Sequence, residues 1–358
     1  MLSRWPDSWH RRAHACRRLP TPYARGKDLF SGNPKLMSLF LITGGCGFIG
    51  SHLCAALVGR GDKVRVLDDL STGSEANLVP GAELIVGDVG NPATVCAAME
   101  GVDGCVHLAA IASVERGVRD WLGTHRVNLS GSIAVLDAAR LRRVPVVYAS
   151  SAAIYGDQVN LPIAESAPKR PLSAYGADKL GCEQHALVAG VVHGTPTLGL
   201  RFFNVFGPRQ DPRSPYSGVI SIFCDRFSQG GDVDIFGDGE QTRDFVFVSD
   251  VVAALLAGLK AASTEAPVLN VCTGRPISVR HLAETVAAVC GRSATIQYGS
   301  PRAGEIRHSL GDPHRSRAVL GLGEPRGLRE GLEEVVAWLR AGRPGLRATG
   351  GSAQPIGA

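Results

Sequence analysis

Apolar and polar positions follow two different periods between residues 39 and 203. Short apolar runs predict buried strands at 39–43, 63–67, 83–87, 104–108, 144–150 and 197–203. The segments between them carry apolar residues at helical spacing, and helices are expected, for example, at 47–59, 127–142 and 174–192. This alternation is typical of a parallel sheet with helices on both faces. It predicts an α/β fold, a doubly wound parallel (Rossmann) sheet with a smaller α/β substrate-binding domain at the C-terminal side.

The regular alternation ends after Asn204, where loops rich in Pro and Gly replace it. We expect 37–204 to form a first domain, with 244–273 returning to it, and 205–243 and 274–340 to form the second domain. Gly237-Asp238-Gly239 is expected to form a hairpin turn between two strands.

Both ends of the chain lack this pattern. Residues 1–36 contain four prolines among their arginines, which forbids a long amphipathic helix. We expect a disordered basic extension, upstream of an alternative translation start at Met37. An organelle transit peptide is the less favoured alternative. Residues 341–358 are expected to form a loose tail.

Composition and charge exclude several classes of protein. Of the 358 residues, 44% are hydrophobic and 20% charged, which is too apolar for a disordered chain. No run of about 18 apolar residues could cross a bilayer. The net charge is +5, but residues 1–36 hold eight Lys and Arg against two acidic residues, which leaves −1 for 37–358. The folded part therefore gives no electrostatic reason to expect a nucleic acid or a membrane as partner.

The nine cysteines are scattered without any Cys-x-x-Cys pair. Neither a disulfide framework nor a metal site is expected from this spacing. Unpaired thiols are typical of a reducing compartment, so we expect the protein to be cytoplasmic.

A glycine-rich loop, Thr43-Gly44-Gly45-Cys46-Gly47-Phe48-Ile49-Gly50, follows the first predicted strand and opens the first helix. Gly44 allows a tight turn, Gly47 lets the backbone approach a pyrophosphate at the helix N-terminus, and Gly50 permits close packing of helix on strand. Such a loop alone can be a structural turn, because the chain has 44 glycines. Its place between strand and helix favours dinucleotide binding, with Phe48 and Ile49 at the start of the helix.

Acidic residues at the next strand end sharpen this hypothesis. Asp68 and Asp69 follow the glycine loop by about 20 residues, where a carboxylate accepts hydrogen bonds from ribose hydroxyls and repels a 2′-phosphate. We therefore expect NAD rather than NADP, and 37–204, with 244–273, as the NAD-binding Rossmann domain. Later strand ends offer further contacts for the same ligand, expected from Asp88, Val89, Leu108, Ala109 and Ala110.

Tyr175 and Lys179 are four residues apart in a predicted helix, so their side chains lie on one face. A phenol is a weak base at neutral pH, and adjacent positive charge from a lysine and an oxidised nicotinamide favours its ionised form. An isolated Tyr-x-x-x-Lys is more often structural. Here it follows a dinucleotide loop, and Ser151 ends a buried strand with its hydroxyl placed to bond a substrate hydroxyl. We interpret the three residues as catalytic.

The motifs form an ordered series over residues 38–340: TGGCGFIG, VLDDLSTG, GDV, HLAA, SSAAIYGD, YGADK, LRFFNVFGPRQDP, FGDGEQTRDFVFVSDV and PRAGEIRHSLGD. In this series the chain resembles the extended short-chain dehydrogenases/reductases, most closely the NAD-dependent UDP-glucose and UDP-N-acetylglucosamine 4-epimerases. The resemblance implies an NAD that stays bound through turnover, with Tyr175 as acid/base, Lys179 on the nicotinamide ribose and Ser151 assisting. It also implies that Asn128 and Phe203 line the cofactor site.

Two arginines in the loop-rich region, Arg243 and Arg302, carry guanidinium groups that match phosphate oxygens. A single surface arginine is more often only a solvated charge. The resemblance implies that both bind the diphosphate of a UDP-sugar. It adds further substrate contacts: Asn204 at the diphosphate, Val219 and Phe236 near the uracil, and Glu305, where the family more often has aspartate, at the uridine ribose.

The position seven residues after Arg302 bears on the sugar. In the family a tyrosine there narrows the sugar pocket, whereas a small residue leaves room beside the C2 substituent. This sequence has Ser309. We therefore expect UDP-GlcNAc and UDP-GalNAc to be accepted, alone or in addition to UDP-glucose and UDP-galactose. The implied reaction is reversible inversion at C4 by transient oxidation, during which the UDP is held and the keto sugar turns over.

Two other functions are considered. A 4,6-dehydratase or decarboxylase of the same superfamily starts with the same oxidation but needs an acidic residue beside Ser151, where this sequence has Ala152 and Ala153. A non-catalytic NAD-binding regulatory module commonly lacks the tyrosine or the lysine, and both are present here. The resemblance also implies a homodimer, formed through 127–142 and 174–192.

Overall fold

The first strand of the central sheet leads directly into the glycine-rich loop and the first helix. The structure is a computed structural model and describes residues 37–112, 114–212, 218–301 and 306–342. Residues from Leu36 onwards form one compact unit. The expected basic extension 1–36 and residues 343–358 of the expected tail lie outside the described residues.

Seven parallel strands form the main sheet, in the order β10-β6-β5-β4-β1-β2-β3. Their bounds are β1 Leu39–Thr43, β2 Lys63–Asp68, β3 Glu83–Val86, β4 Gly104–His107, β5 Val146–Ser151, β6 Thr197–Phe202 and β10 Val268–Val271. Each of the six predicted strands overlaps an observed one, and the predicted doubly wound sheet is confirmed. The strand order reverses between β1 and β4, since the chain builds outwards from β1 to β3 and then returns to the other side of β1. Ligands of such sheets bind at this point, beyond the carboxyl ends of the strands.

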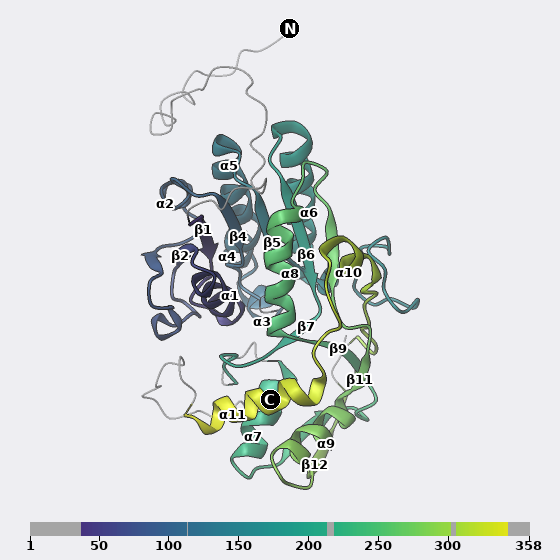
Figure 1. The fold of residues 1–358 in the computed structure, drawn as a ribbon. Helices are drawn as coiled ribbons and strands as arrows, with labels where there is room; N and C mark the ends of the chain where they lie inside the picture. Colours follow the sequence, from purple (N-terminus) through teal and green to yellow (C-terminus); the bar gives the residue numbers. More distant parts are fainter. Residues whose placement is uncertain (1–36, 113, 213–217, 302–305, 343–358) are drawn as a thin grey trace. The chain divides into compact units, whose positions relative to one another are not determined.

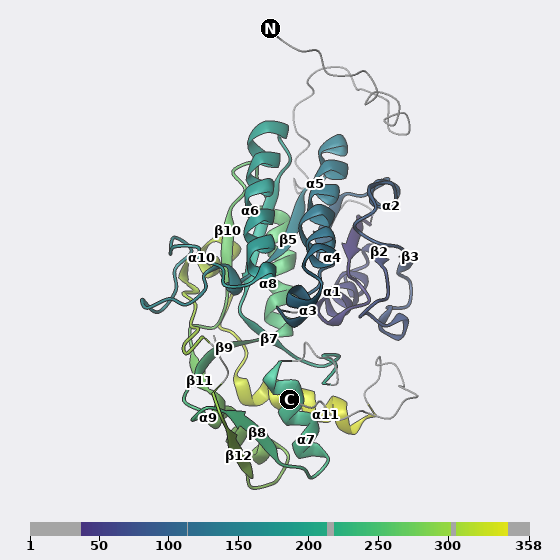
Figure 2. The ribbon, with the colours of Figure 1, turned by 180° about the vertical axis from the view of Figure 1, so that it is seen from behind.

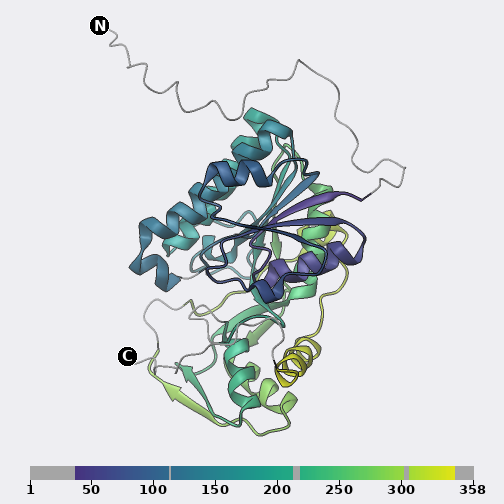
Figure 3. The ribbon, with the colours of Figure 1, turned by 90° about the vertical axis from the view of Figure 1, so that its left-hand side faces the viewer.

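Helices cover both faces of the sheet. Helices α1 (Phe48–Gly59) and α8 (Val248–Ala261) pack on one face (Figure 1). Helices α2 (Pro92–Ala98), α5 (Gly131–Arg142) and α6 (Ala174–His193) pack on the other (Figure 2). Figure 3 shows the sheet edge-on between these two layers. The remaining elements of this part are η2 Glu75–Asn77, α3 Val114–Arg119, α4 Trp121–His125, η3 Arg126–Ser130, η4 Ala152–Ile154 and α10 His314–Leu320.

Alternation of side chains along each strand builds two separate cores. In β1, Ile42 points to the α1 and α8 side, where it packs with buried residues such as Leu53 and Leu255. Its neighbour Leu41 points to the opposite side, among residues of α2, α5 and α6 such as Val135. Apolar burial on both faces explains why the strands are nearly continuous apolar runs in the sequence.

A smaller half follows β6 directly. A three-stranded sheet contains β7 (Asn204–Phe206), β9 (Thr242–Phe247) and β11 (Pro276–Ser278), and a two-stranded parallel sheet contains β8 (Val233–Phe236) and β12 (Ile296–Gly299). Helices α7 (Val219–Ser228), α9 (Val279–Val289) and α11 (Leu328–Arg340) pack together beside them. Strand β10 is part of the large sheet and helix α8 packs on it, whereas β9 belongs to the smaller half. The domain limits drawn from the sequence stay a prediction.

The predicted hairpin at Gly237-Asp238-Gly239 is wrong. Strand β8 pairs in parallel with β12, and β9 pairs with β7 and β11, so the two strands beside this turn lie in different sheets. Gly237 and Gly239 have φ values of +83° and +80°, which lets the chain leave one sheet and enter the other. Sequence-local turn chemistry could not reveal this, because the partner of β8 lies far along the chain.

Candidate active site

The glycine loop is a close-packed backbone turn between β1 and α1. The N–H of Gly44 donates to the Leu67 carbonyl at 2.8 Å, and Gly44 has a φ of +71°. A Cβ at Gly44 would lie 2.8 Å from the Ala109 nitrogen, and a Cβ at Gly50 would lie 2.1 Å from the Gly44 carbonyl oxygen. No side chain caps the first turn of α1 at Gly47, and no acidic residue lies in that turn. Bare backbone N–H groups at a helix N-terminus fit the pyrophosphate of a dinucleotide.

Two carboxylates stand at the end of β2 beside this loop. Asp68 is buried, with Oδ2 accepting from the Cys46 N–H and Oδ1 from the Leu70 N–H, both at 2.9 Å. Asp69 is exposed and accepts from the backbone and the hydroxyl of Ser71. Each carboxylate oxygen can accept more than one hydrogen bond, so ribose hydroxyls still find acceptors here. Two negative charges at this position disfavour a 2′-phosphate.

One cleft of about 600 Å³ runs along the carboxyl ends of the parallel strands. Its lining includes these residues proposed from the sequence: Gly44, Gly47, Phe48, Ile49, Gly50, Asp68, Asp69, Asp88, Val89, Leu108, Ala109, Ala110, Ser151, Tyr175, Lys179, Phe203 and Asn204. The fold therefore brings the proposed catalytic group and the proposed cofactor contacts into one cavity. Volume, glycine cradle and carboxylates all fit NAD.

The three residues expected to be catalytic lie where α6 begins beside the end of β5. Ser173 caps α6 by accepting from the Gly176 N–H at 3.1 Å. Lys179 is buried, donates to the Ala149 carbonyl at 2.8 Å, and has its Nζ 5.8 Å from the centre of the Tyr175 ring. Ser151 Oγ accepts from the Ala153 N–H at 3.1 Å, which leaves its proton to donate to a ligand.

A buried ion pair lies one helical turn beyond the lysine, and sequence reasoning missed it. Glu183 accepts from Arg201 Nε at 2.9 Å and Nη2 at 2.8 Å, and both side chains are only 4% exposed. Ser150, which lines the cleft, donates to Glu183 Oε1 at 2.5 Å. Tyr175, Lys179 and Glu183 recur every four residues, which is the signal that could have placed the glutamate on the same face of α6.

Asn128 does not line the cleft. Its side chain is fully buried in the π-helical turn η3, where the amide accepts from the Ile111 N–H at 2.7 Å and donates to the Ile111 carbonyl at 3.1 Å. Ile111 itself lines the cleft. Asn128 therefore supports a lining residue from behind, a distinction that motif position alone does not reveal.

A neutral histidine fixes the ends of β1 and β4. Thr43 Oγ1 accepts from the Leu108 and Ala109 N–H groups at 3.2 Å, so its own proton goes to His107 Nδ1 at 2.7 Å. His107 Nε2 then donates to Ser132 Oγ at 3.0 Å. Burial, reinforced by the charge of Lys179, lowers the pKa of His107 to about 3. This chain of hydrogen bonds holds the backbone against which a cofactor lies.

The predicted substrate contacts are more dispersed. Val219 follows Gly218, which lines the cleft, but is not itself part of the lining. Phe236 lies in a second pocket of about 410 Å³. Arg243 Nη1 donates to the Thr242 and Arg307 carbonyls at 2.9 and 3.4 Å. Ser309 donates its N–H to the Thr242 carbonyl at 3.1 Å and lies outside the lining of both pockets. Arg302 and Glu305 lie outside the described residues.

Charged residues around the cleft were also missed by sequence reasoning. Arg126 donates to Asp88 Oδ2 at 2.8 Å, and Arg116 and Asp120 line the cleft beside it. Arg116 lies in α3, Asp120 caps α4 and Arg126 begins η3, and none of these residues belongs to a motif quoted from the sequence. Within the described ranges, no group of three or more His, Cys, Asp or Glu could hold a metal ion. None of the described helices has the length and apolar character needed to cross a membrane.

The sheet and the glycine cradle define a dinucleotide-binding protein, in which a phenol and a lysine, Tyr175 and Lys179, line the cofactor cleft. Residues 40–272 match the sequence model of the NAD dependent epimerase/dehydratase family. The chain belongs to this family.

Relatives extend over most of the chain. The UDP-glucose 4-epimerase of Mycolicibacterium smegmatis is 36% identical over 314 residues, 84% of this chain and 98% of that protein. Thermotoga maritima UDP-glucose 4-epimerase, solved with UDP-glucose, has a TM-score of 0.81 at 34% identity, covering 85% of this chain and 99% of that one. Methanobrevibacter ruminantium UDP-N-acetylglucosamine 4-epimerase, in complex with UDP-N-acetylmuramic acid, has a TM-score of 0.81 at 33% identity, covering 86% and 99%. A dTDP-glucose 4,6-dehydratase of an Actinoplanes species is 31% identical over 319 residues, covering 85% and 98%.

Proposed function

We propose that the protein is a UDP-sugar 4-epimerase that inverts C4 of a UDP-hexose with bound NAD. One observation carries the proposal: Ser151, Tyr175 and Lys179 share a single cleft with the glycine cradle, so a sugar hydroxyl beside the tyrosine would also lie beside a nicotinamide. The Thermotoga and Methanobrevibacter epimerases, similar over most of their length, support the same reaction class.

The chain's own residues account for the proton transfer. When bound, NAD would supply the chemistry of a reversible two-electron acceptor. Tyr175 accepts the proton of the C4 hydroxyl and returns it after the sugar has presented its other face. Lys179, held in place by the Ala149 carbonyl, stabilises the ionised phenol by its positive charge. Ser151 donates to the same sugar oxygen, because its other hydrogen bond uses Oγ as acceptor.

The dehydratase is the second candidate, since one relative has that name. Elimination of water requires an acid and a base beyond the tyrosine. Ala152 and Ala153 follow Ser151 in η4 and carry no such group. Epimerisation needs no second proton donor, and the site is built accordingly. Mass spectrometry of the product separates the two reactions, because only the dehydratase product is lighter by one water.

The decisive experiment incubates the purified protein with UDP-GlcNAc and UDP-glucose separately, without added NAD. We expect the 4-epimer of at least one sugar to accumulate to equilibrium with no net reduction of cofactor. Conversion of the sugar that consumes added NAD, or no conversion at all, would contradict an epimerase.

Ser309 bears on which sugar is used. Serine leaves room beside the sugar C2, and we propose that the N-acetylated pair is accepted. A Ser309→Tyr variant should lose conversion of UDP-GlcNAc, by about tenfold or more in kcat/KM, and keep that of UDP-glucose. Retention of full N-acetyl activity in the variant would count against this assignment.

A homodimer through α5 and α6 is part of the proposal. These two helices pack side by side, and apolar side chains on them are solvent-exposed in the single chain: Ile133, Leu141, Leu187, Val188, Val191 and Val192. Exposed apolar residues gathered on neighbouring helices are typical of a protein interface. Sedimentation at micromolar concentration tests it, with Val191→Asp expected to give monomers and a monomeric wild type as the contradicting result.

A further inference from the structure

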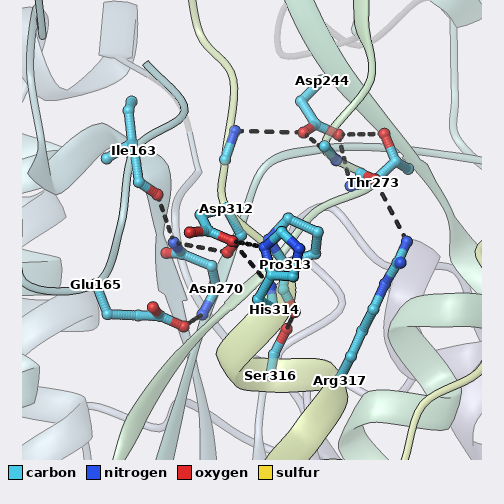
Figure 4. Close-up of polar contacts among 12 residues, drawn as sticks. Ile163, Glu165, Asp244, Asn270, Thr273, Asp312, Pro313, His314, Ser316 and Arg317 are labelled. Carbon is cyan, nitrogen blue, oxygen red and sulfur yellow. Dashed lines mark hydrogen bonds and ion pairs between the residues drawn. The ribbon is translucent and has the colours of Figure 1, made fainter. Parts of the chain in front are cut away.

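Asp244 is a fully buried carboxylate next to Arg243 in β9. Its Oδ1 accepts from the Thr273 N–H and hydroxyl, both at 2.7 Å, and its Oδ2 accepts from the Gly274 N–H at 2.9 Å and the Gly311 N–H at 3.3 Å (Figure 4). Burial raises the pKa of Asp244, although the hydrogen bonds to it act in the opposite direction. The carboxylate thus joins β9 to the end of β10 and to a third segment.

That third segment, residues 307–312, is named here the bridging segment. Thr242 in β9 donates its N–H to the Arg307 carbonyl at 3.0 Å and accepts from the Ser309 N–H at 3.1 Å. Two residues further along β9 and two further along the bridging segment, the Asp244 side chain accepts a hydrogen bond from the Gly311 N–H. The carboxylate therefore continues the attachment of the bridging segment to β9.

The other edge of the bridging segment contacts the chain that follows the catalytic serine. Ile163 donates its N–H to the Leu310 carbonyl at 2.8 Å and accepts from the Asp312 N–H at 3.0 Å. Asn270 of β10 donates to the Ile163 carbonyl at 2.9 Å (Figure 4). The bridging segment is thus held between β9 on one side and Ile163, in the chain between η4 and α6, on the other.

Gly311 shows how closely this segment approaches the cofactor cleft. A Cβ at Gly311 would lie 2.6 Å from Cys272 Sγ and 2.7 Å from Phe203 Cζ. Phe203 lines the cleft. The segment that carries Ser309 therefore packs directly behind a lining residue, with Asp244 bonded to its closest point.

We propose that Asp244 is a positioning residue for the UDP-sugar: through its hydrogen bonds it sets Arg243 and Ser309 at fixed positions relative to each other and to the cofactor cleft. This inference rests on the proposed function, with Ser309 beside the sugar, and on the role at the diphosphate that the family resemblance implies for Arg243. Asp244 lies outside the cleft lining and acts through three backbone N–H groups and the Thr273 hydroxyl. Its removal should weaken substrate binding and spare the chemical step.

The test uses the purified holoenzyme with Asp244→Asn. An asparagine keeps one acceptor oxygen and turns an NH₂ group towards two donors. The hydrogen bonds either from Thr273 or from Gly274 and Gly311 are therefore lost. We expect the Kd for UDP, measured by calorimetry, and the KM for each UDP-sugar to rise about tenfold or more. The kcat at saturation and the NAD content should stay within about twofold of wild type.

Two further variants make the result decisive. Asp234→Asn is the matched control, because it removes the same charge from an exposed carboxylate of the same half, and it should leave Kd and KM unchanged. If Asp244→Asn does not fold, Thr273→Val removes the hydroxyl that donates to Asp244 and accepts from the Arg275 N–H, and should raise the Kd for UDP about three- to fivefold.

Unchanged Kd and KM in the folded variant would overturn the proposal, as would an equal loss of NAD content, kcat and affinity, which indicates general destabilisation. The proposed function fails separately. A wild type that binds UDP but converts no UDP-sugar contradicts the proposed epimerase activity. The Kd values of wild type and Asp244→Asn for UDP would still decide the role of Asp244.

Discussion

The cofactor side and the substrate side of this protein are built in different ways. Most of the expected cofactor contacts lie at the carboxyl ends of parallel strands or in the first turn of the following helix, so one edge of the sheet brings them into a single cleft. Of the described residues expected at the substrate, Ser151 and Asn204 line that cleft, while Phe236 lines another pocket and Arg243 and Ser309 depend on pairing between distant segments. A site at aligned strand ends follows from local motifs, whereas a site assembled across separate sheets depends on the tertiary structure.

Tyr175 is where the two sides meet, and its change should have the largest effect. In Tyr175→Phe the proton acceptor is gone but the ring remains, so kcat should fall about 10²- to 10⁴-fold. NAD content and UDP affinity should stay at wild-type values, since the glycine cradle and β9 are untouched. Epimerisation rates measured beside cofactor content check this. A variant that keeps a tenth of the wild-type rate would remove the tyrosine from the proposed chemistry.

Ion pairs in the two regions should differ sharply in their contribution to stability. Arg201→Met leaves Glu183 buried without its partner, and the free energy of unfolding should fall by about 3–5 kcal/mol. Arg226→Met, the matched control, breaks the Arg226–Asp234 pair of 3.0 Å between half-exposed side chains, and should cost about 0–1 kcal/mol. Urea unfolding of both variants measures the difference. Equal losses would mean that the pair beneath the catalytic helix contributes no more than a surface pair.

The sequence could predict the parts of the site that depend on short-range order. The Gly44–Gly50 loop, Asp68 and the Tyr175–Lys179 spacing each occupy one strand end or one helix, where chain order and spatial order agree. The pairing of Glu183 with Arg201 joins α6 to β6, and neither residue carries a motif that names the other.

Similar reasons explain the wrong and missing predictions. The turn at Gly237–Gly239 has the composition of a hairpin, but the partner of β8 comes from β12, which no local pattern indicates. The family resemblance implies that Asn128 lines the cofactor site, and its neighbours Arg126 and Val127 do line the cleft, yet the π-helical turn places its side chain behind Ile111. Asp244 lies beside Arg243 in the sequence, and its role emerges only when Gly274 and Gly311 are brought to it.

The glycine cradle can be broken within a single helix. Gly50→Ala places a Cβ 2.1 Å from the backbone oxygen of Gly44, which cannot move aside as a flexible side chain could. We expect a loss of about 1–3 kcal/mol in the free energy of unfolding and substoichiometric NAD after purification. Gly59→Ala at the other end of α1 meets nothing within 4 Å and should be neutral or stabilising by up to about 1 kcal/mol. Full NAD content in Gly50→Ala would show that the close approach is not needed.

The smallest expected effect is the response of the cofactor side to acid. His107 is buried and neutral, and its pKa is lowered from 6.5 to about 3, first by burial and then by Lys179. Between these two values the unfolded chain binds a proton that the folded chain does not, so stability falls as the pH falls below 6.5. At pH 5.5 the loss from this residue should reach about 1.4 kcal/mol, relative to neutral pH.

A His107→Gln variant isolates this contribution, because it removes the titrating group and keeps an amide able to reach Thr43 or Ser132. Its stability is expected to be lower than that of wild type at pH 7.5, and the difference between the two proteins should narrow by about 1.4 kcal/mol at pH 5.5. Urea unfolding at both pH values measures the narrowing, and other titrating groups cancel in the comparison. A constant difference would mean that His107 takes up a proton in the folded state. The hydrogen bond that Thr43 donates to Nδ1, and with it the support of Leu108 and Ala109, would then differ from the structure described.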